Sequence, residues 1–358
     1  MQPNRRVRIH FFNPWAGSRT LEDLDTYLTN LPKIDLAAQV QDPKNADLMQ
    51  MARLDCDWHG ECTRCFGSLT HTDLEFLPAR VVGLNSLMAL AEAILSRPKD
   101  EEWWLCFMAQ HPQKLENAAG PLLAFAHNNG IRILYYAFDE ASRTMPCFKS
   151  IAPYLDVLVH DEYPLDPENS KPLNPDCQSV HRSWVANIVP FAAPFNEQPE
   201  RKILFLGSRL GLTEHRSRQI KFLKKEFKDR FICHTDHSVS VADRFSLRRY
   251  QVGWSPEGRK FSTPAMSRSH TDRPFWSGCL VMVPLSENSR SGKRLEELAG
   301  AGLIVRYEHA DLHGLRDACE RALELTVEDR KRIYEHFNHH ETVGAVVAPL
   351  IAHHKSSV

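Results

Sequence analysis

Residues Tyr250–Pro284, YQVGWSPEGRKFSTPAMSRSHTDRPFWSGCLVMVP, are the stretch that decides the fold. The stretch opens with YQVGWS, an apolar run that ends in turn-forming residues. It closes with CLVMVP, a continuous apolar run between Gly278 and Pro284. Runs of this kind are typical of strands that are covered on both faces. Two such strands joined by a crossover predict a parallel α/β sheet.

Positive charge and small polar side chains fill the segment between these two predicted strands. Open α/β sheets bind ligands at the carboxyl ends of their strands, where this segment begins. Arginine suits phosphate oxygens because its guanidinium donates hydrogen bonds in a fork. Charge alone favours a simpler interpretation, an ordinary βα unit with a solvated basic face. The alternative is a pyrophosphate site, for which the candidates are Ser255, Gly258, Arg259, Arg268 and Arg273. The wider set of candidate ligand-binding residues in this segment also includes Glu257 and Asp272.

The order of these parts resembles the nucleotide-sugar half of GT-B glycosyltransferases. A strand, then SPEGR, then a short arginine-bearing helix ending in FWSGCLVMVP is similar to the region that holds the donor's diphosphate and sugar. Spore-maturation-type and family-1-like enzymes are nearest, and the likeness to exostosin-type enzymes is looser. Many of these families have an acidic residue five positions before the glycine, where this chain has Arg273 beside Asp272. The resemblance therefore implies phosphate binding, but it does not imply that a carboxylate recognises the sugar.

Two further parts of the second half carry the same resemblance. IVPFAAPF at 188–195 is similar to the connection into the second domain of these enzymes. KILFLGS at 202–208 predicts a strand followed by a turn, and the next helix has an arginine near its start, as the family pattern does. The resemblance adds these residues to the candidate donor site: Gly207, Ser208 and Arg216.

Length and composition indicate a soluble globular chain of about two domains. The chain has 358 residues, of which 42% are hydrophobic and 25% charged, and its formal net charge is −1. We expect no membrane span, no signal peptide and a cytoplasmic protein whose nine cysteines are mostly reduced thiols. The absence of G-x-G-x-x-G and P-loop patterns argues against dehydrogenases and nucleoside triphosphatases. The first 195 residues are net acidic, which argues mildly against duplex DNA as a partner.

A cysteine-rich segment, CDWHGECTRC, suggests a metal site. Thiolates and an imidazole spaced by two residues can surround a tetrahedral Zn²⁺ ion. Zinc sites usually join two ligand pairs that lie far apart in sequence, however, so a polar loop with free thiols is the other interpretation. The candidate structural zinc ligands are Cys56, His59, Cys62 and Cys65.

Ionisable residues follow three successive predicted strands of the first half: His111, Asp139 with Glu140, and His160 with Asp161. The carboxyl ends of parallel strands line the ligand side of a sheet, although carboxylates at these places are also common helix caps. Asp139 follows the most apolar run, ILYYAF, so partial desolvation would raise its pKa toward a value useful for a base. We expect Asp139 to be the catalytic base, and His160 is the second choice because imidazole titrates near neutrality.

The combined prediction is an α/β protein with two Rossmann-like domains that face a cleft. Residues 1–195 form the acceptor domain with the cysteine-rich insert near 56–71, residues 196–340 bind the nucleotide sugar, and residues 341–358 cross back. The predicted reaction moves a hexosyl or pentosyl group from a nucleotide-diphosphate sugar to a hydroxyl, without a metal ion at the donor site. The acceptor stays open between a small molecule, a glycan and a hydroxylated nucleic-acid base, which some phage enzymes of similar construction modify. The alternative function is a non-catalytic, zinc-knuckle protein associated with nucleic acid.

Overall fold

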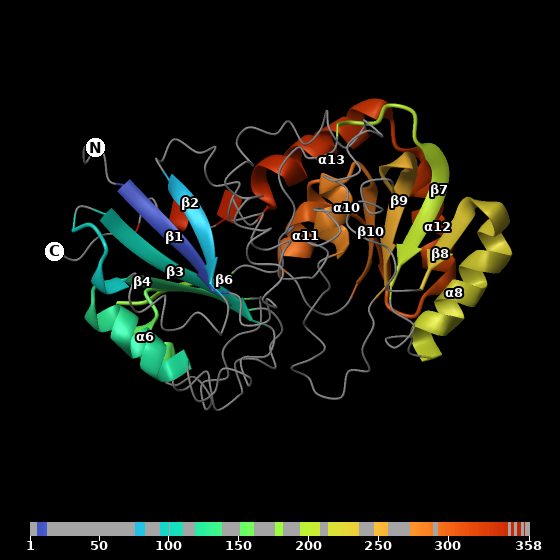
Figure 1. Cartoon of the computed structure of the whole chain (residues 1–358). Coiled ribbons are helices and arrows are strands. Elements are labelled where there is room, and N and C mark those ends of the chain that lie inside the picture. Colours follow the sequence, from blue (N-terminus) through green and yellow to red (C-terminus); the bar gives the residue numbers. More distant parts are fainter. Residues whose placement is uncertain are drawn as a thin grey trace. The chain divides into compact units, whose positions relative to one another are not determined.

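The computed structural model of the chain (Figure 1) describes residues 6–12, 76–82, 94–99, 101–109, 119–137, 151–160, 176–181, 194–207, 214–235, 247–256, 273–288, 293–342, 345–346, 349–351 and 354. The chain divides into two compact units. The first comprises Met1–Ile34, Leu54–Arg182 and Val346–Val358, and the second comprises Asp35–Arg53 and Ser183–Ala345. None of the helices in the described part of the chain is long and apolar enough to cross a membrane.

The first unit is built on a six-stranded sheet in which every paired strand is parallel. The strand order is β2-β1-β3-β4-β5-β6. Helix α6 packs on β4, and Gly130, with φ of +70°, ends the helical segment in the left-handed conformation that glycine adopts without strain. The elements of this unit are β1 (Arg6–Phe12), β2 (Phe76–Val82), β3 (Glu101–Ala109), α6 (Ala119–Asn128), β4 (Arg132–Ala137), a 3₁₀ turn (Ala152–Tyr154), β5 (Val157–His160) and β6 (Gln178–His181).

The second unit is built on a five-stranded parallel sheet with the order β8-β7-β9-β10-β11. Helices α10 and α11 lie on one side of it and α8 and α12 on the other (Figure 1). The elements are β7 (Glu200–Leu206), α8 (Glu214–Phe227), a 3₁₀ turn (Lys228–Arg230), β8 (Phe231–His234), a 3₁₀ turn (Leu247–Arg249), β9 (Tyr250–Ser255), α10 (Arg273–Cys279), β10 (Val283–Asn288), α11 (Lys293–Gly300), β11 (Val305–Glu308), α12 (Leu312–Glu324) and α13 (Val327–His340).

The strand predicted over CLVMVP begins later than the sequence suggested. Cys279 still belongs to α10, and Val281, with φ of +71°, takes the left-handed position of a turn in which Met282 N–H donates to Ser277 O. Strand β10 starts at Val283 and includes Pro284, which lies level with Gly253 of β9 instead of ending the strand. The parallel sheet itself is confirmed, because β9 and β10 are neighbours and both are almost entirely buried.

Close packing of α10 depends on two glycines. A Cβ atom at Gly253 would lie 2.4 Å from Ser277 Oγ, and a Cβ atom at Gly278 would lie 2.3 Å from the ring of Phe337 on α13. Both distances are shorter than any real Cβ contact, so side chains at these places would push α10 away from β9 or from α13. The glycine of the FWSGC segment is therefore a packing requirement of the fold.

The C-terminal end of the chain returns to the first unit after α13. The ring of His354 packs edge-on against Trp104 of β3, with 5.2 Å between ring centroids. Its Nε2 lies 3.9 Å from Asp156 Oδ1, and the Asp156 carboxylate also holds Arg132 at 2.9 Å. His354 thus packs against the core of the first unit.

Candidate functional site

The carboxyl edge of the second sheet is the place where most of the described candidate residues meet. The strand order β8-β7-β9-β10-β11 is that of a doubly wound sheet, whose connections change direction between β7 and β9. Ligands of open α/β sheets bind outside the carboxyl ends of the strands at this switch point. Gly207 follows β7 and Ser255 ends β9, so both predicted residues lie at the switch point.

Two predicted arginines also reach this edge. Arg273, the first residue of α10, donates from Nε to Leu206 O at the end of β7, at 2.9 Å. Arg216, in the first turn of α8, is only 4% exposed. Its Nη2 donates to Pro256 O, just after β9, at 3.3 Å, and its guanidinium lies 5.9 Å from the centre of the Phe205 ring. Two guanidinium groups are therefore held at the ends of β7 and β9.

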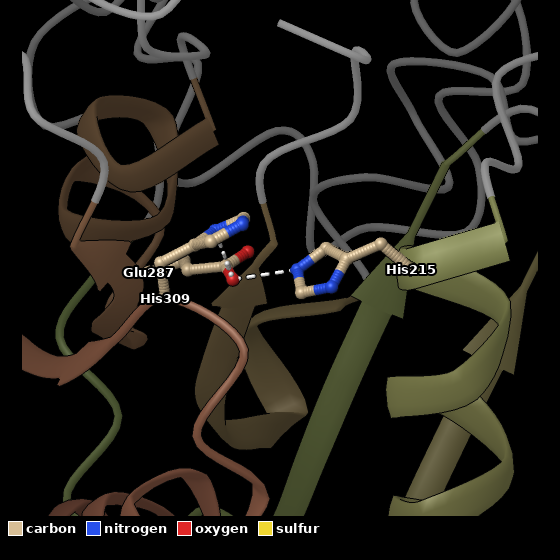
Figure 2. Close-up of side chains that lie close together, drawn as sticks. All are labelled: His215, Glu287 and His309. Atoms are coloured by element: carbon tan, nitrogen blue, oxygen red, sulfur yellow. Dashed lines mark hydrogen bonds and ion pairs between the residues drawn. The ribbon is translucent and has the colours of Figure 1, made fainter.

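A cluster of three further residues, His215, Glu287 and His309, lies along the same edge (Figure 2). His215 comes from the first turn of helix α8, Glu287 is the next-to-last residue of strand β10, and His309 directly follows strand β11. Glu287 Oε1 lies 2.6 Å from His215 Nε2 and 2.9 Å from His309 Nδ1. The two imidazole rings lie 4.5 Å apart, centroid to centroid. We call these three residues the His–Glu cluster.

The carboxylate of the cluster is fully buried and is held by a second layer of polar groups. Gln219 Nε2 donates to Glu287 Oε1 at 3.1 Å and to Tyr307 Oη at 3.2 Å, and Trp254 Nε1 donates to the same Tyr307 oxygen at 3.0 Å. Burial raises the pKa of Tyr307 well above its usual value, and the charge of nearby Glu287 raises it further. The phenol therefore stays neutral and serves as a fixed hydrogen-bonding partner in the core.

A tight turn after β11 brings the last donor to the cluster. Ala310 has a positive φ of 62°, which is uncommon for a residue other than glycine and costs about 1–3 kcal/mol. Its N–H lies 3.2 Å from Glu287 Oε1. The side chain of Asp311 then accepts a hydrogen bond from Gly314 N and caps helix α12. The strained turn thus aims both His309 and a backbone amide at one carboxylate.

Of the two acceptor-side candidates, His160 ends β5 of the first sheet. Ala137 of β4 is level with His160 of β5, and His160 is level with His181 of β6, so these three strands end together. Asp139 comes two residues after the end of β4 and lies outside the described residues. Of His160 the backbone is described, and it ends β5 as predicted.

The remaining predicted residues also lie outside the described part of the chain. On the donor side these are Ser208, Glu257, Gly258, Arg259, Arg268 and Asp272; in the cysteine-rich segment they are Cys56, His59, Cys62 and Cys65. Their roles stay predictions.

The sequence reasoning missed the His–Glu cluster. His215, Glu287 and His309 are spread over 95 residues and meet only because α8, β10 and β11 present their ends at one sheet edge. The available signal was SEN at 286–288, in which an acidic residue follows a buried apolar run. A carboxylate at a strand end of this kind is a candidate for a site, as it was for Asp139.

Comparison with solved structures identifies the fold. No protein-family model matches the chain, and no curated protein sequence matches it. An alpha-glucosyltransferase in complex with UDP and a 13-mer DNA containing a central A:G mismatch is similar, with a TM-score of 0.52 and 11% identity over 95% of this chain and 97% of that chain. An alpha-glucosyltransferase in complex with UDP-glucose and DNA containing an abasic site has a TM-score of 0.50 and 10% identity over 96% and 97%. An alpha-glucosyltransferase in complex with UDP and a 13-mer DNA containing a HMU base has a TM-score of 0.50 and 11% identity over 95% and 96%. Because the identities are this low, the likeness shows the fold alone: the chain has a GT-B-like α/β fold with two parallel sheets, as predicted from Tyr250–Pro284.

Proposed function

We propose that the chain is a glycosyltransferase that moves a hexose from a uridine-diphosphate sugar to a hydroxyl group of a modified DNA base. The observation that carries the proposal is the convergence of Arg216 and Arg273 on the switch point of the second sheet, in a fold shared with glucosyltransferases. Guanidinium groups at that position suit a diphosphate. The motif resemblance of Tyr250–Pro284 to nucleotide-sugar sites supports the same assignment.

The donor diphosphate would lie against the ends of β7 and β9. Arg273 and Arg216 would neutralise its charge, and Gly207 would let the phosphates approach the backbone closely. Stabilising the charge that develops on the leaving diphosphate lowers the barrier of the transfer step. Arginines can supply the compensating positive charge by themselves, so transfer without a metal ion on the phosphates stays a prediction. A cytoplasmic location also stays a prediction.

The proposal of a DNA acceptor is supported by what the structural neighbours were solved with. Three of them are complexes with DNA, and one of these DNAs contains a HMU base. The family resemblance of the sequence also leaves a hydroxylated nucleic-acid base open as an acceptor. We propose a hexose as the transferred sugar for a similar reason, because one structural neighbour was solved with UDP-glucose.

The transfer step needs an acceptor oxygen that is ready to attack. The oxygen forms a bond to the anomeric carbon of the sugar while the bond from that carbon to the diphosphate oxygen breaks, and the electron pair leaves with the diphosphate. If the configuration inverts, a base accepts the hydroxyl proton, and we propose Asp139 for this role with His160 as the second choice. A product with retained configuration would remove the need for such a base.

The first experiment is a donor screen on the full chain. Melting curves are recorded with a panel of nucleotide sugars, because a ligand that binds only the folded state raises the melting temperature. We expect the largest shift with UDP-hexoses, and an unchanged melting temperature with every nucleotide sugar would contradict the proposal. Arg273→Ala supplies the control, since it should reduce the shift.

The alternative function, a zinc-knuckle protein without catalytic activity, has no support from the fold. Its ligands, Cys56, His59, Cys62 and Cys65, lie outside the described residues. Binding to DNA without sugar transfer, together with one equivalent of zinc held by thiolates, would be the result that favours it.

A further inference from the structure

The three side chains of the His–Glu cluster form a ready set of metal ligands. His215, Glu287 and His309 each offer one ligand atom, and these three atoms all lie within 4.8 Å of one another. They come from three different elements, so the fold brings them together, and Figure 2 shows both imidazole rings directed at the carboxylate. We propose that this cluster binds one divalent transition-metal ion.

Nitrogen atoms crowd around one oxygen of the Glu287 carboxylate, and this crowding indicates a cation in the cluster. Glu287 Oε1 has four nitrogen atoms within 3.2 Å: His215 Nε2, His309 Nδ1, Gln219 Nε2 and Ala310 N. A carboxylate oxygen offers about two lone-pair sites, so four donors are more than it accommodates well. A metal ion between the carboxylate and the imidazoles removes two of these donors, because each ring then presents a lone pair to the ion. Gln219 and Ala310 remain as hydrogen-bond donors to the carboxylate.

The ligand types select the class of metal. Two imidazoles and one carboxylate suit Zn²⁺ and other first-row transition metals, whereas Mg²⁺ and Ca²⁺ prefer sites built from oxygen ligands. Zinc bonds of about 2.0–2.2 Å place tetrahedral ligand atoms roughly 3.4 Å apart. The present N–O distances of 2.6 and 2.9 Å therefore need to grow by less than about 1 Å. Both rings have room to move, because His215 is 27% exposed and His309 is 43% exposed.

The buried surroundings of Glu287 match the support that metal ligands usually have. Ligating carboxylates are themselves hydrogen-bonded, and the outer partners fix their orientation. Here Gln219 holds Glu287 and is held in turn through Tyr307, which also accepts from Trp254. The carboxylate is thus fixed, and the two histidines are the adjustable part of the site.

Three protein ligands leave one coordination position open, as in catalytic zinc sites. The partial exposure of both imidazoles places this position on the outer side of the cluster, along the same sheet edge as Arg216 and Arg273. A water molecule takes this position in catalytic zinc sites. Binding of the ion does not depend on the proposed function.

The test is a metal titration of the full chain after treatment with a chelator. Zn²⁺ binding is measured by calorimetry in the Cys56→Ser/Cys62→Ser/Cys65→Ser triple variant, so that the thiolate candidates of the cysteine-rich segment are removed from the readout. Co²⁺ is then added and the absorption spectrum is recorded. The spectrum distinguishes the two kinds of ligand, because cobalt bound to nitrogen and oxygen ligands lacks the intense charge-transfer bands of cobalt thiolates. We expect one ion per chain and a spectrum without thiolate bands.

Three single variants in that background assign the site. His215→Gln and His309→Gln should each weaken Zn²⁺ binding by at least tenfold, a loss that even outer-shell changes reach. His313→Gln, an exposed histidine of α12 outside the cluster, is the matched control and should bind as the parent does. Because the two cluster histidines are partly exposed, these variants avoid the folding risk of replacing the buried Glu287.

Two outcomes overturn the assignment. One is that Zn²⁺ does not bind, or binds equally well to the His215→Gln and His309→Gln variants. The other is that the chelator-treated chain binds inorganic pyrophosphate but no metal ion, and that both variants lose the binding of pyrophosphate. This result would make the cluster an anion site. A chain that binds Zn²⁺ at the cluster but no UDP-sugar would contradict the proposed function and leave the metal site standing.

Discussion

Replacing Arg273 by alanine tests the donor edge of the second sheet. The Arg273 guanidinium is anchored by the bond from Nε to Leu206 O at 2.9 Å, which places its positive charge at the carboxyl end of β7. A hydrogen bond between such a charge and a phosphate contributes about 1.5–3 kcal/mol. Losing one such bond should therefore weaken donor binding by about 10- to 150-fold.

The assay is calorimetric titration of the folded chain with UDP and with the UDP-sugar that gives the largest thermal shift. Arg201→Ala is the matched control: Arg201 lies near the opposite end of β7 and also donates to a backbone carbonyl, Leu323 O, at 3.1 Å. Each variant loses a guanidinium–carbonyl bond, whose contribution to the free energy of unfolding is about 1 kcal/mol. Only Arg273→Ala should lose donor affinity. Equal donor affinities in Arg273→Ala and the unmodified chain would refute the reasoning.

Three further predictions concern packing, protonation and the acceptor side. Gly278→Ala should lower the free energy of unfolding by about 1–3 kcal/mol, because its Cβ would meet the buried Phe337 ring at 2.3 Å. Adding Phe337→Leu should recover part of that loss in a denaturant titration, and strictly additive losses would argue against the clash. The pKa of His340 is lowered, chiefly by burial and then by His336 and His339. The unfolded chain therefore binds a proton at this histidine more readily than the folded chain does. The free energy of unfolding consequently decreases as the pH falls below about 6.5. An NMR titration should give His340 a pKa below 6.5, and unfolding measured across that pH range should depend less on pH in His340→Gln. Asp139→Asn should lower turnover roughly 100-fold or more with donor affinity unchanged. Normal turnover in that variant, with a loss in His160→Ala, would move the base to β5.

Much of the fold was predictable because central strands such as β5, β9 and β10 are almost entirely buried. RVRIHFF alternates and then becomes apolar, whereas KILFL and YQVGWS are apolar runs. The lengths of all three suit strands, and β1, β7 and β9 cover these segments. Helix α8, which follows β7, buries Ile220, Leu223 and Phe227 at helical spacing and exposes polar residues between them, a pattern that a single sequence shows well. Helix boundaries follow from local signals such as Gly130, whose positive φ ends the segment of α6.

The start of β10 was wrong because the usual turn signal is missing. A residue with positive φ after a helix is commonly glycine, but here Val281 takes that position in an apolar sequence. The run CLVMVP therefore looks like one strand although its first residue is helical. Pro284 adds to the error, since proline usually ends a strand, yet it lies inside β10.

The candidate site was predictable in part, for a similar physical reason. Gly207, Arg216, Ser255 and Arg273 lie close to the ends of predicted strands, so their meeting at one edge follows from parallel topology. The His–Glu cluster depends on the order of β10 and β11 in the sheet and on the strained turn at Ala310. Neither feature is visible in the sequence around the three residues.

The most direct test of sugar transfer to DNA follows the mass of a DNA strand. The full chain is incubated with UDP-glucose and a duplex that contains one hydroxymethylated base, and the same duplex with the unmodified base serves as the control. The account predicts that the modified strand gains the mass of one hexose, that the control strand gains none, and that Arg273→Ala slows the gain. No mass change in the modified strand with any UDP-hexose, under conditions where the donor binds, would contradict it.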